Sequence, residues 1–209
     1  MQIEIFQDMV CPWCRIGKKN LADAIAQWTG EPIQIQYRAY QLFPDLPKEG
    51  KPFLEVMASK GSPEMVQQML SQVTRAGEAA NLPFRFDKVE KMPNTLASHQ
   101  FIKSVPAADT ARVVDAIYKA YFEDGKDIGD LQVLLGLAEE LGLDREQIRD
   151  AIENERHTDE INADIAFARD NQISGVPFFI IDGKLALSGA HAPENFLKAF
   201  HHVRNMENE

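Results

Sequence analysis

The stretch M-V-C-P-W-C-R, residues 9–15, holds the only two cysteines of the chain in a C-x-x-C spacing. Residues 3–6 before it, I-E-I-F, alternate apolar and polar side chains as a β-strand does. Residues 15–25 after it carry apolar side chains at near-helical spacing. Pro12 suits the first turn of that helix, because its missing N–H group would have no partner there. The sequence therefore predicts that both cysteines lie where a strand leads into a helix.

The positions of the two thiols predict their chemical roles. A helix N-terminus favours a thiolate, because unpaired N–H groups and partial positive charge meet there, so we expect Cys11 to be the nucleophile. Arg15 follows on the same helix face and is expected to add positive charge near Cys11. Cys14 lies one turn further along, where we expect it to be less exposed and close enough to bridge to Cys11. A nucleophilic thiol with a resolving thiol is the minimum set for thiol–disulfide exchange.

Other interpretations of a C-x-x-C motif remain open from these residues alone. The two cysteines would also suit plain buried positions, a static disulfide or half of a zinc site. Zinc needs four ligands, usually with a second pair of Cys or His. The chain has no further cysteine, and the neighbouring His201 and His202 are poorly spaced for such a pair. We therefore expect no metal centre.

Composition and charge narrow the class of protein. The 209 residues allow one elaborated domain or two small ones, with enough chain for a sizeable core. The apolar fraction of 44% and charged fraction of 26% are typical of globular proteins. A net charge of −10, from 32 acidic and 22 basic residues without a basic stripe, argues against nucleic acid and anionic membranes as partners.

The sequence also bears on the compartment. No apolar run reaches the length of a membrane-spanning helix, and no secretory signal pattern precedes the first strand. We therefore expect a cytoplasmic protein. Disulfides in the cytoplasm are usually transient and catalytic, which favours cysteines that cycle between redox states.

The remaining chain divides into blocks of predicted structure. A second strand at residues 33–40 is followed by a Pro-rich loop at 43–52. From Phe53 to about residue 173 the pattern is helical throughout. The helical segments are expected from Pro63, from Asn94, and over 107–122, 131–141, 144–155 and 161–168.

Strand signals return near the end of the chain. Residues 177–181 form a short apolar run, and Asp182-Gly183 is a two-residue turn that favours positive φ. Residues 184–188 supply the return strand. A last helix begins at Ala192, and residues 204–209 are expected to be a frayed polar tail.

This order predicts an α/β fold. A right-handed crossover would pair the first two strands in parallel, and the terminal hairpin would complete a mixed four-stranded sheet. The helical block is then an insertion. We expect residues 1–52 and 173–209 to form one discontinuous domain and residues 53–172 to form the insertion domain.

A second motif, S-G-V-P-F-F at residues 174–179, connects the chain to a known family. A proline that opens a central strand needs a strand start or a special turn, because it lacks a ladder N–H group. With this motif in place, the chain resembles the DsbA-like thioredoxin superfamily, and most closely its FrnE-like branch. The matching features are C-P-W-C at 11–14, the helical insertion, Asn94-Thr95 with His99, G-V-P-F-F at 175–179 and S-G-A at 188–190.

The resemblance implies both a fold and an activity. It implies a thioredoxin fold with a large all-helical insertion between the second and third strands. It also implies a redox-active Cys11/Cys14 pair, a cis Pro177 that faces it, and backbone at Val176 that receives substrate as an added strand. The implied protein is a thiol–disulfide oxidoreductase without a cofactor. Its expected partners are protein disulfides and dithiols, or glutathione as a small co-substrate.

Two alternatives stay open beside that activity. Relatives that act as glutathione-dependent transferases of the kappa type, or as 2-hydroxychromene-2-carboxylate isomerases, usually carry Ser where this chain has Cys11. The cysteine favours exchange over thiol activation. A non-catalytic binding or holdase module with a vestigial site is the other alternative.

Further residues beside the cysteines are candidates for substrate binding or redox tuning. Pro12 and Trp13 stand between the two thiols, and Trp13 would either stack on substrate or shield Cys14. His99 either serves the site or is a structural histidine of an amphipathic helix. Asp8, just before the motif, would either relay protons or accept hydrogen bonds in the turn.

Two other groups carry weaker signals. Four methionines would either line an adaptable substrate groove or fill the core; they are Met57, Met65, Met69 and Met92. Lys18 and Lys19 are expected on a solvated helix face.

Overall fold

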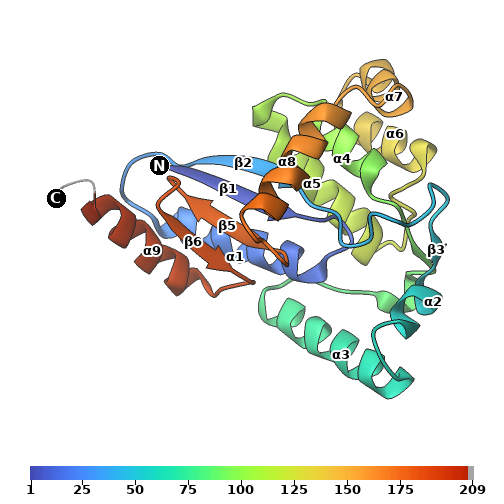
Figure 1. Ribbon diagram of the computed structural model, residues 1–209, viewed down its shortest axis with the longest axis horizontal. Helices are drawn as coiled ribbons and strands as arrows, with labels where there is room; N and C mark the ends of the chain where they lie inside the picture. Colours follow the sequence, from blue (N-terminus) through green and yellow to red (C-terminus); the bar gives the residue numbers. More distant parts are fainter. Residues whose placement is uncertain (207–209) are drawn as a thin grey trace.

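A mixed four-stranded sheet forms the centre of the computed structural model, which describes residues 1–206 (Figure 1). The strand order is β2-β1-β5-β6. The central strand β1 (Gln2–Gln7) pairs in parallel with β2 (Gln34–Ala39) and antiparallel with β5 (Phe178–Ile181). The edge strand β6 (Leu185–Ser188) returns antiparallel beside β5. The predicted α/β sheet, including its terminal hairpin, is confirmed.

Helices cover both faces of this sheet. Helix α1 (Pro12–Gln27) and helix α9 (Pro193–Met206) pack together on one face, and α8 (Thr158–Asp170) lies against the other (Figure 1). The alternation of β1 decides this division, because Ile3 and Ile5 enter the large core while Phe6 belongs to a smaller cluster on the α8 side. The sheet is therefore buried on both faces.

The block between β2 and β5 supplies most of the helices. These are α2 (Phe53–Ala58), α3 (Pro63–Ala79), α4 (Leu96–Lys103), α5 (Ala107–Phe122), α6 (Leu131–Glu140), α7 (Arg145–Glu153) and α8. The domain boundaries at residues 53 and 172 remain a prediction.

The expectation that this block is helical throughout is wrong between α3 and α4. Here the chain forms the short 3-10 helix η1 (Phe86–Lys88) and strand β4 (Lys91–Met92), which pairs with β3 (Lys51–Pro52). Pro83 and Pro93 explain the break, because a proline lacks the helical N–H group and restrains the residue before it. Apolar spacing alone did not reveal this.

The end of the chain is more ordered than expected. Helix α9 continues to Met206, so a frayed tail over residues 204–206 is wrong, and residues 207–209 lie outside the described part. Val203 is fully buried, and the Arg204 guanidinium lies 5.1 Å from the centre of the Trp28 ring. Packing against α1 therefore holds the last turn in place.

The contact between α1 and the loop before β5 leaves no room for a side chain at Gly17. A Cβ atom there would lie 2.9 Å from Cγ of Pro177 and 3.1 Å from Cζ of Phe179. Such distances require one of the partners to shift. Glycine at this position therefore sets how closely the cysteine-bearing helix approaches Pro177.

Replacing Gly17 by Ala tests this contact. We expect Gly17→Ala to lower the free energy of unfolding by about 1–3 kcal/mol, as overpacking of a close-packed site does. Gly136→Ala is the matched control, since nothing lies within 4 Å of a Cβ atom there and a helical Gly→Ala change stabilises by about 0.5–1 kcal/mol. Urea unfolding curves of both variants measure the difference; equal stabilities would contradict the contact.

Candidate active site

Cys11 caps the N-terminus of α1. It has extended backbone angles, φ −90° and ψ 109°, and Pro12 occupies the first helical turn. The Cys11 N–H donates to the Asp8 carbonyl at 3.1 Å, and the Cys11 carbonyl accepts from the Cys14 N–H at 3.1 Å. The side chain of Cys11 makes no capping hydrogen bond to the helix. The predicted strand–turn–helix setting of the thiols is confirmed.

The loop before β5 lies against this turn. The Val176–Pro177 peptide bond is cis, as the resemblance implied. The Cys11 thiol donates from Sγ to the Val176 carbonyl oxygen at 3.5 Å. On its other side the loop is tied to the strand β6 end, because the Gly189 N–H donates to the Pro177 carbonyl at 2.8 Å. The fold thus brings the two sequence motifs into direct contact.

Cys14 is the less accessible thiol, as expected. Its relative exposure is 0%, against 4% for Cys11, and both cysteines are free. Burial raises the pKa of the Cys14 thiol well above its usual range, and the hydrogen bond and charge of Cys11 raise it further. Cys14 is therefore protonated near neutral pH, and Cys11 is the more accessible of the two thiols.

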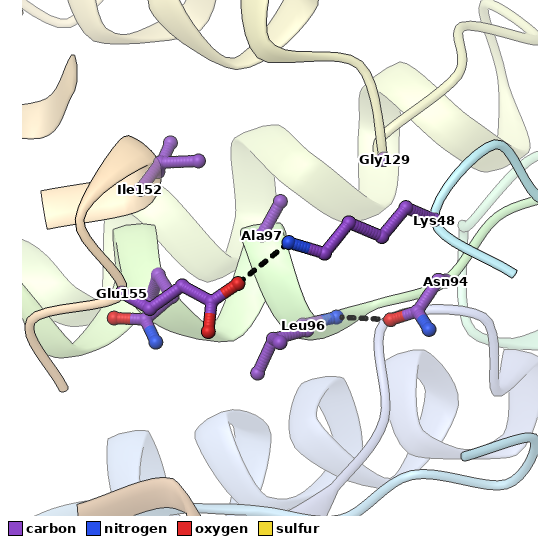
Figure 2. A pocket seen from close by; sticks show the side chains of 8 residues that line it. Lys48, Asn94, Leu96, Ala97, Gly129, Ile152 and Glu155 are labelled. Carbon is purple, nitrogen blue, oxygen red and sulfur yellow. Dashed lines mark hydrogen bonds and ion pairs between the residues drawn. The ribbon is translucent and has the colours of Figure 1, made fainter. Parts of the chain in front are cut away.

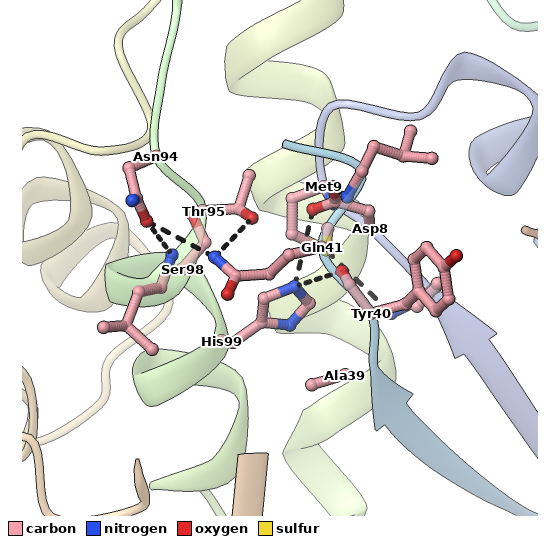
Figure 3. A network of polar contacts seen from close by, with 12 residues as sticks. Asp8, Met9, Ala39, Tyr40, Gln41, Asn94, Thr95, Ser98 and His99 are labelled. Carbon is pink, nitrogen blue, oxygen red and sulfur yellow. Dashed lines mark hydrogen bonds and ion pairs between the residues drawn. The ribbon is translucent and has the colours of Figure 1, made fainter. Parts of the chain in front are cut away.

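A buried polar network surrounds the residue before the motif (Figure 3). Asp8 is fully buried, and its carboxylate accepts from the N–H groups of Met9 at 2.8 Å and Leu42 at 2.7 Å. His99 Nε2 lies 3.1 Å from the Tyr40 carbonyl oxygen and 3.4 Å from Asp8 Oδ1. Because a carbonyl only accepts, Nε2 must carry a hydrogen. Asp8 and His99 thus tie the cysteine loop to α4 and to the chain after β2.

These contacts bear on the alternative roles predicted for Asp8 and His99. Asp8 accepts hydrogen bonds in the turn, which was one of its two predicted roles. His99 is buried, and its Nε2 contacts the Tyr40 carbonyl. Both residues connect the loop that carries the thiols to its neighbouring segments. Figure 3 also shows Asn94, whose Oδ1 accepts from the Leu96 N–H at 3.0 Å and so fixes the start of α4.

One neighbour of the thiols, Tyr118, was missed in the sequence. Tyr118 on α5 is fully buried and donates its hydroxyl to Gln7 Oε1 at 3.1 Å and to the Asp8 carbonyl at 3.3 Å. Burial raises the pKa of Tyr118 well above its usual range, with smaller contributions from Cys14 and Cys11. In the sequence Tyr118 is one more member of an apolar helix stripe, which conceals its polar contact.

A groove of about 340 Å³ opens beside Cys11. Its walls come from the cysteine loop, the loop after β2, the helices α2 and α3, and the segment before α4. The lining residues are Val10, Cys11, Pro12, Trp13, Leu42, Phe43, Phe53, Met57, Lys60, Met69, Leu70, Gln72, Val73, Phe86, Met92, Phe122 and Val176. Apolar side chains therefore dominate the surface that leads to the candidate nucleophile.

The groove bears on the predicted roles of Trp13 and of the four methionines. Trp13 lines it together with Cys11. Met57, Met69 and Met92 also line it, whereas Met65 does not and is 53% exposed on α3. Two of the three lining methionines, Met57 and Met92, also belong to the buried core, so the two alternatives overlap at these positions.

Comparison with known proteins assigns the family. A family profile described as DSBA-like thioredoxin domain matches residues 2–201. The chain belongs to this family. The thioredoxin-like fold expected from the resemblance is thereby confirmed, with its mixed sheet and helical insertion.

Relatives of this DSBA-like chain extend over nearly its full length. It is 27% identical to YwbO of Bacillus subtilis (strain 168) over 201 residues, which is 95% of each chain. A probable DsbA oxidoreductase from Streptomyces coelicolor has a TM-score of 0.90 and 27% identity, covering 98% of this chain and 90% of that one. The cytosolic disulfide reductase DsbM of Pseudomonas aeruginosa, solved with GSH, has a TM-score of 0.70 and 19% identity, covering 99% and 100%. The likeness to DsbM shows a shared fold.

Arg15 connects α1 to the insertion. Its guanidinium donates to the Pro83 carbonyl at 2.7 Å, pairs with Glu123 and lies 5.2 Å from the centre of the Phe84 ring. These partners were not expected from the sequence. An effect of the Arg15 charge on Cys11 stays a prediction.

The expectation of a solvated face at Lys18 and Lys19 is wrong for one of the two. Lys18 is buried, and its Nζ pairs with Asp115 at 2.6 Å. Lys19 is half-buried and pairs with Asp23 on its own helix. Helix α5 covers the position of Lys18, which a view of α1 alone does not reveal.

A second hollow, of about 150 Å³, lies apart from the cysteines (Figure 2). Lys48 and Glu155 form an ion pair of 2.7 Å across it, and Asn94 and Leu96 line it. The Asn94 side chain is already engaged, because its Nδ2 donates to the Leu46 carbonyl at 2.7 Å. The ion pair and this hydrogen bond connect the loop after β2 to the insertion.

Two kinds of feature are absent from residues 1–206. No cluster of three or more His, Cys, Asp or Glu side chains suited to a metal ion occurs among these residues. No helix in the same range is long and apolar enough to cross a membrane.

The difference between the thiols predicts their order of alkylation. In the reduced native protein, iodoacetamide at pH 7 should modify Cys11 at least about tenfold faster than Cys14, because reactivity follows thiolate fraction and access. Peptide mass spectrometry after timed quenching measures both rates. The denatured protein is the control and should label at both positions. Faster labelling of Cys14 in the native state would reverse the assignment.

Proposed function

We propose that the chain is a thiol–disulfide oxidoreductase in which Cys11 is the nucleophile and Cys14 the resolving thiol. The observation that carries this proposal is the arrangement of the two free thiols. Cys11 sits at the start of α1, 3.5 Å from the Val176 carbonyl, and Cys14 lies buried one turn behind it. Membership of the DSBA-like family supports the same reaction class.

The exchange proceeds in two steps. The Cys11 thiolate attacks one sulfur of a substrate disulfide, which forms a Cys11–substrate disulfide and releases the other substrate sulfur as a thiolate. Cys14 then loses its proton and attacks the Cys11 sulfur. A Cys11–Cys14 disulfide forms and the second substrate thiolate leaves. Two electrons pass from the protein to the substrate, and the reverse sequence oxidises a dithiol.

The electrostatics of the pair suit this order of events. The charge and hydrogen bond of Cys11 contribute to the raised pKa of Cys14. Once Cys11 is part of a mixed disulfide it carries no charge, so that contribution disappears. Cys14 therefore loses its proton more readily when its attack is needed than in the resting dithiol.

We further propose that the Val176 backbone receives a main-chain segment of the substrate. Its carbonyl accepts from the Cys11 thiol in the free protein, and Val176 lines the groove together with Trp13. The Cys11 thiol loses its proton on reaction, which frees the Val176 carbonyl for a new donor. Added-strand pairing of this kind supplies affinity through main-chain hydrogen bonds.

The reaction as proposed needs no cofactor beyond the redox-active disulfide. DsbM of Pseudomonas aeruginosa is a cytosolic disulfide reductase. We propose the cytoplasm as the compartment of this chain as well, in line with its sequence-based expectation. The FrnE-like branch also remains our proposal for its place within the family.

Loss of the resolving thiol should trap the intermediate. Cys14→Ser, incubated with a peptide disulfide, should accumulate a Cys11 mixed disulfide, whereas Cys11→Ser should accumulate little. Non-reducing electrophoresis and mass spectrometry of the purified variants measure the adduct, with the double variant as the blank. Equal trapping by both single variants would contradict separate roles. Multiple turnover with glutathione by Cys14→Ser would instead favour the transferase or isomerase alternative.

A further inference from the structure

The groove beside Cys11 combines an apolar lining with one cation. Of its described lining residues, Lys60 is the only charged one and Gln72 the only other with a polar functional group apart from Cys11 and the Trp13 indole N–H. Lys60 lies in the turn between α2 and α3, within the insertion. A ligand held against Cys11 therefore meets apolar surface and one positive charge.

Lys60 has no carboxylate partner within residues 1–206. Its Nζ lies 4.8 Å from the centre of the Phe43 ring, a cation–π contact with a second lining residue. The neighbouring cation Lys51, by contrast, pairs with Glu55 at 3.1 Å. A cation without an acidic partner in a chain of net charge −10 is complementary to an anionic ligand.

We propose that this groove selects a small organic disulfide or thiol that has an apolar body of aromatic size and one carboxylate bound by Lys60. This inference rests on the proposed exchange reaction and names its substrate class. The groove volume of about 340 Å³ falls within the range of small-molecule sites. The carboxylate would replace water around Lys60, while the apolar body covers Phe43, Met69 and Trp13.

The lining disfavours a highly charged substrate. Glutathione carries two carboxylates and an ammonium group, and a groove with one cation would leave the remaining charges against apolar walls. Burying a charge without a partner is costly. An aromatic disulfide with one carboxylate on each half has no such penalty at the half that reaches Cys11, because Lys60 pairs with the single charge of that half.

The reaction with such a substrate is the proposed exchange. The Cys11 thiolate attacks one sulfur of R–S–S–R, a Cys11–S–R disulfide forms, and one R–S⁻ leaves. Cys14 then displaces the second R–S⁻, and the protein retains the Cys11–Cys14 disulfide. The substrate gains two electrons and the protein loses two.

Two aromatic disulfides that differ in charge test the role of Lys60. The probes are 5,5′-dithiobis(2-nitrobenzoate), with a carboxylate on each ring, and the neutral 2,2′-dithiodipyridine. Stopped-flow absorbance gives the rate of reaction of each probe with the reduced protein. The ratio of these rates, compared between variants, cancels the intrinsic reactivity of each probe.

We expect Lys60→Gln to lower the rate with the carboxylate probe by about fivefold, as loss of one partly exposed ion pair would. The rate with the neutral probe should stay within about twofold. Lys60→Glu should lower the rate with the carboxylate probe further, because it places a like charge beside the carboxylate. Lys198→Gln on α9 is the matched control, because it removes the same charge from an exposed site outside the groove and should leave both rates unchanged.

The outcomes separate this inference from the proposed function. Unchanged ratios in Lys60→Gln, with both probes still oxidising Cys11, would overturn the inference and leave the exchange reaction intact. Failure of Cys11 to react with either probe would overturn the proposed function itself. Faster, Lys60-dependent reaction with oxidised glutathione or with a peptide disulfide would overturn the assignment to an apolar small molecule.

Discussion

The close approach of α1 to the loop at Pro177 is the constraint on which the rest of the site depends. Gly17 makes it possible, because any larger residue would press on Pro177 and Phe179. This approach sets the 3.5 Å contact between Cys11 Sγ and the Val176 carbonyl. The reactive thiol and the loop that faces it come from opposite ends of the chain, and a single packed interface holds them together.

Buried polar contacts connect that interface to the insertion. Asp8 and His99 join the cysteine loop to α4, and Arg15 joins α1 to Glu123. A separate contact, Asp164 on α8 with Arg38 on β2 at 2.8 Å, links the insertion to the sheet. Buried charges of this kind are tolerated only where their partners are complete, so each contact restrains the position of both parts.

Local signals explain what could be predicted from the sequence. The C-x-x-C motif, the strand before it and the helix after it were readable because their residues interact with near neighbours. The helix expected from about residue 107 to 122 agrees with α5, since its apolar spacing is long and uninterrupted. The Asp182-Gly183 turn was equally readable, because both residues adopt positive φ in the structure.

Long-range partners explain what could not be predicted. Arg15 was considered only for its charge near Cys11, and its contacts with Pro83 and Glu123 were not foreseen. Lys18 was expected in solvent, yet α5 covers it. No local pattern specifies such partners, because they come from segments many residues away and depend on how the insertion folds back. The groove beside Cys11 has the same origin, since its two walls belong to different parts of the chain.

The low exposure of Cys11 limits which disulfides are able to react. Exchange requires three sulfur atoms to come into line, and a thiol with 4% of its surface exposed permits this approach only along the open side of the groove. For the exchange that we propose, this geometry would favour small molecules and flexible chains over disulfides held in a rigid folded surface.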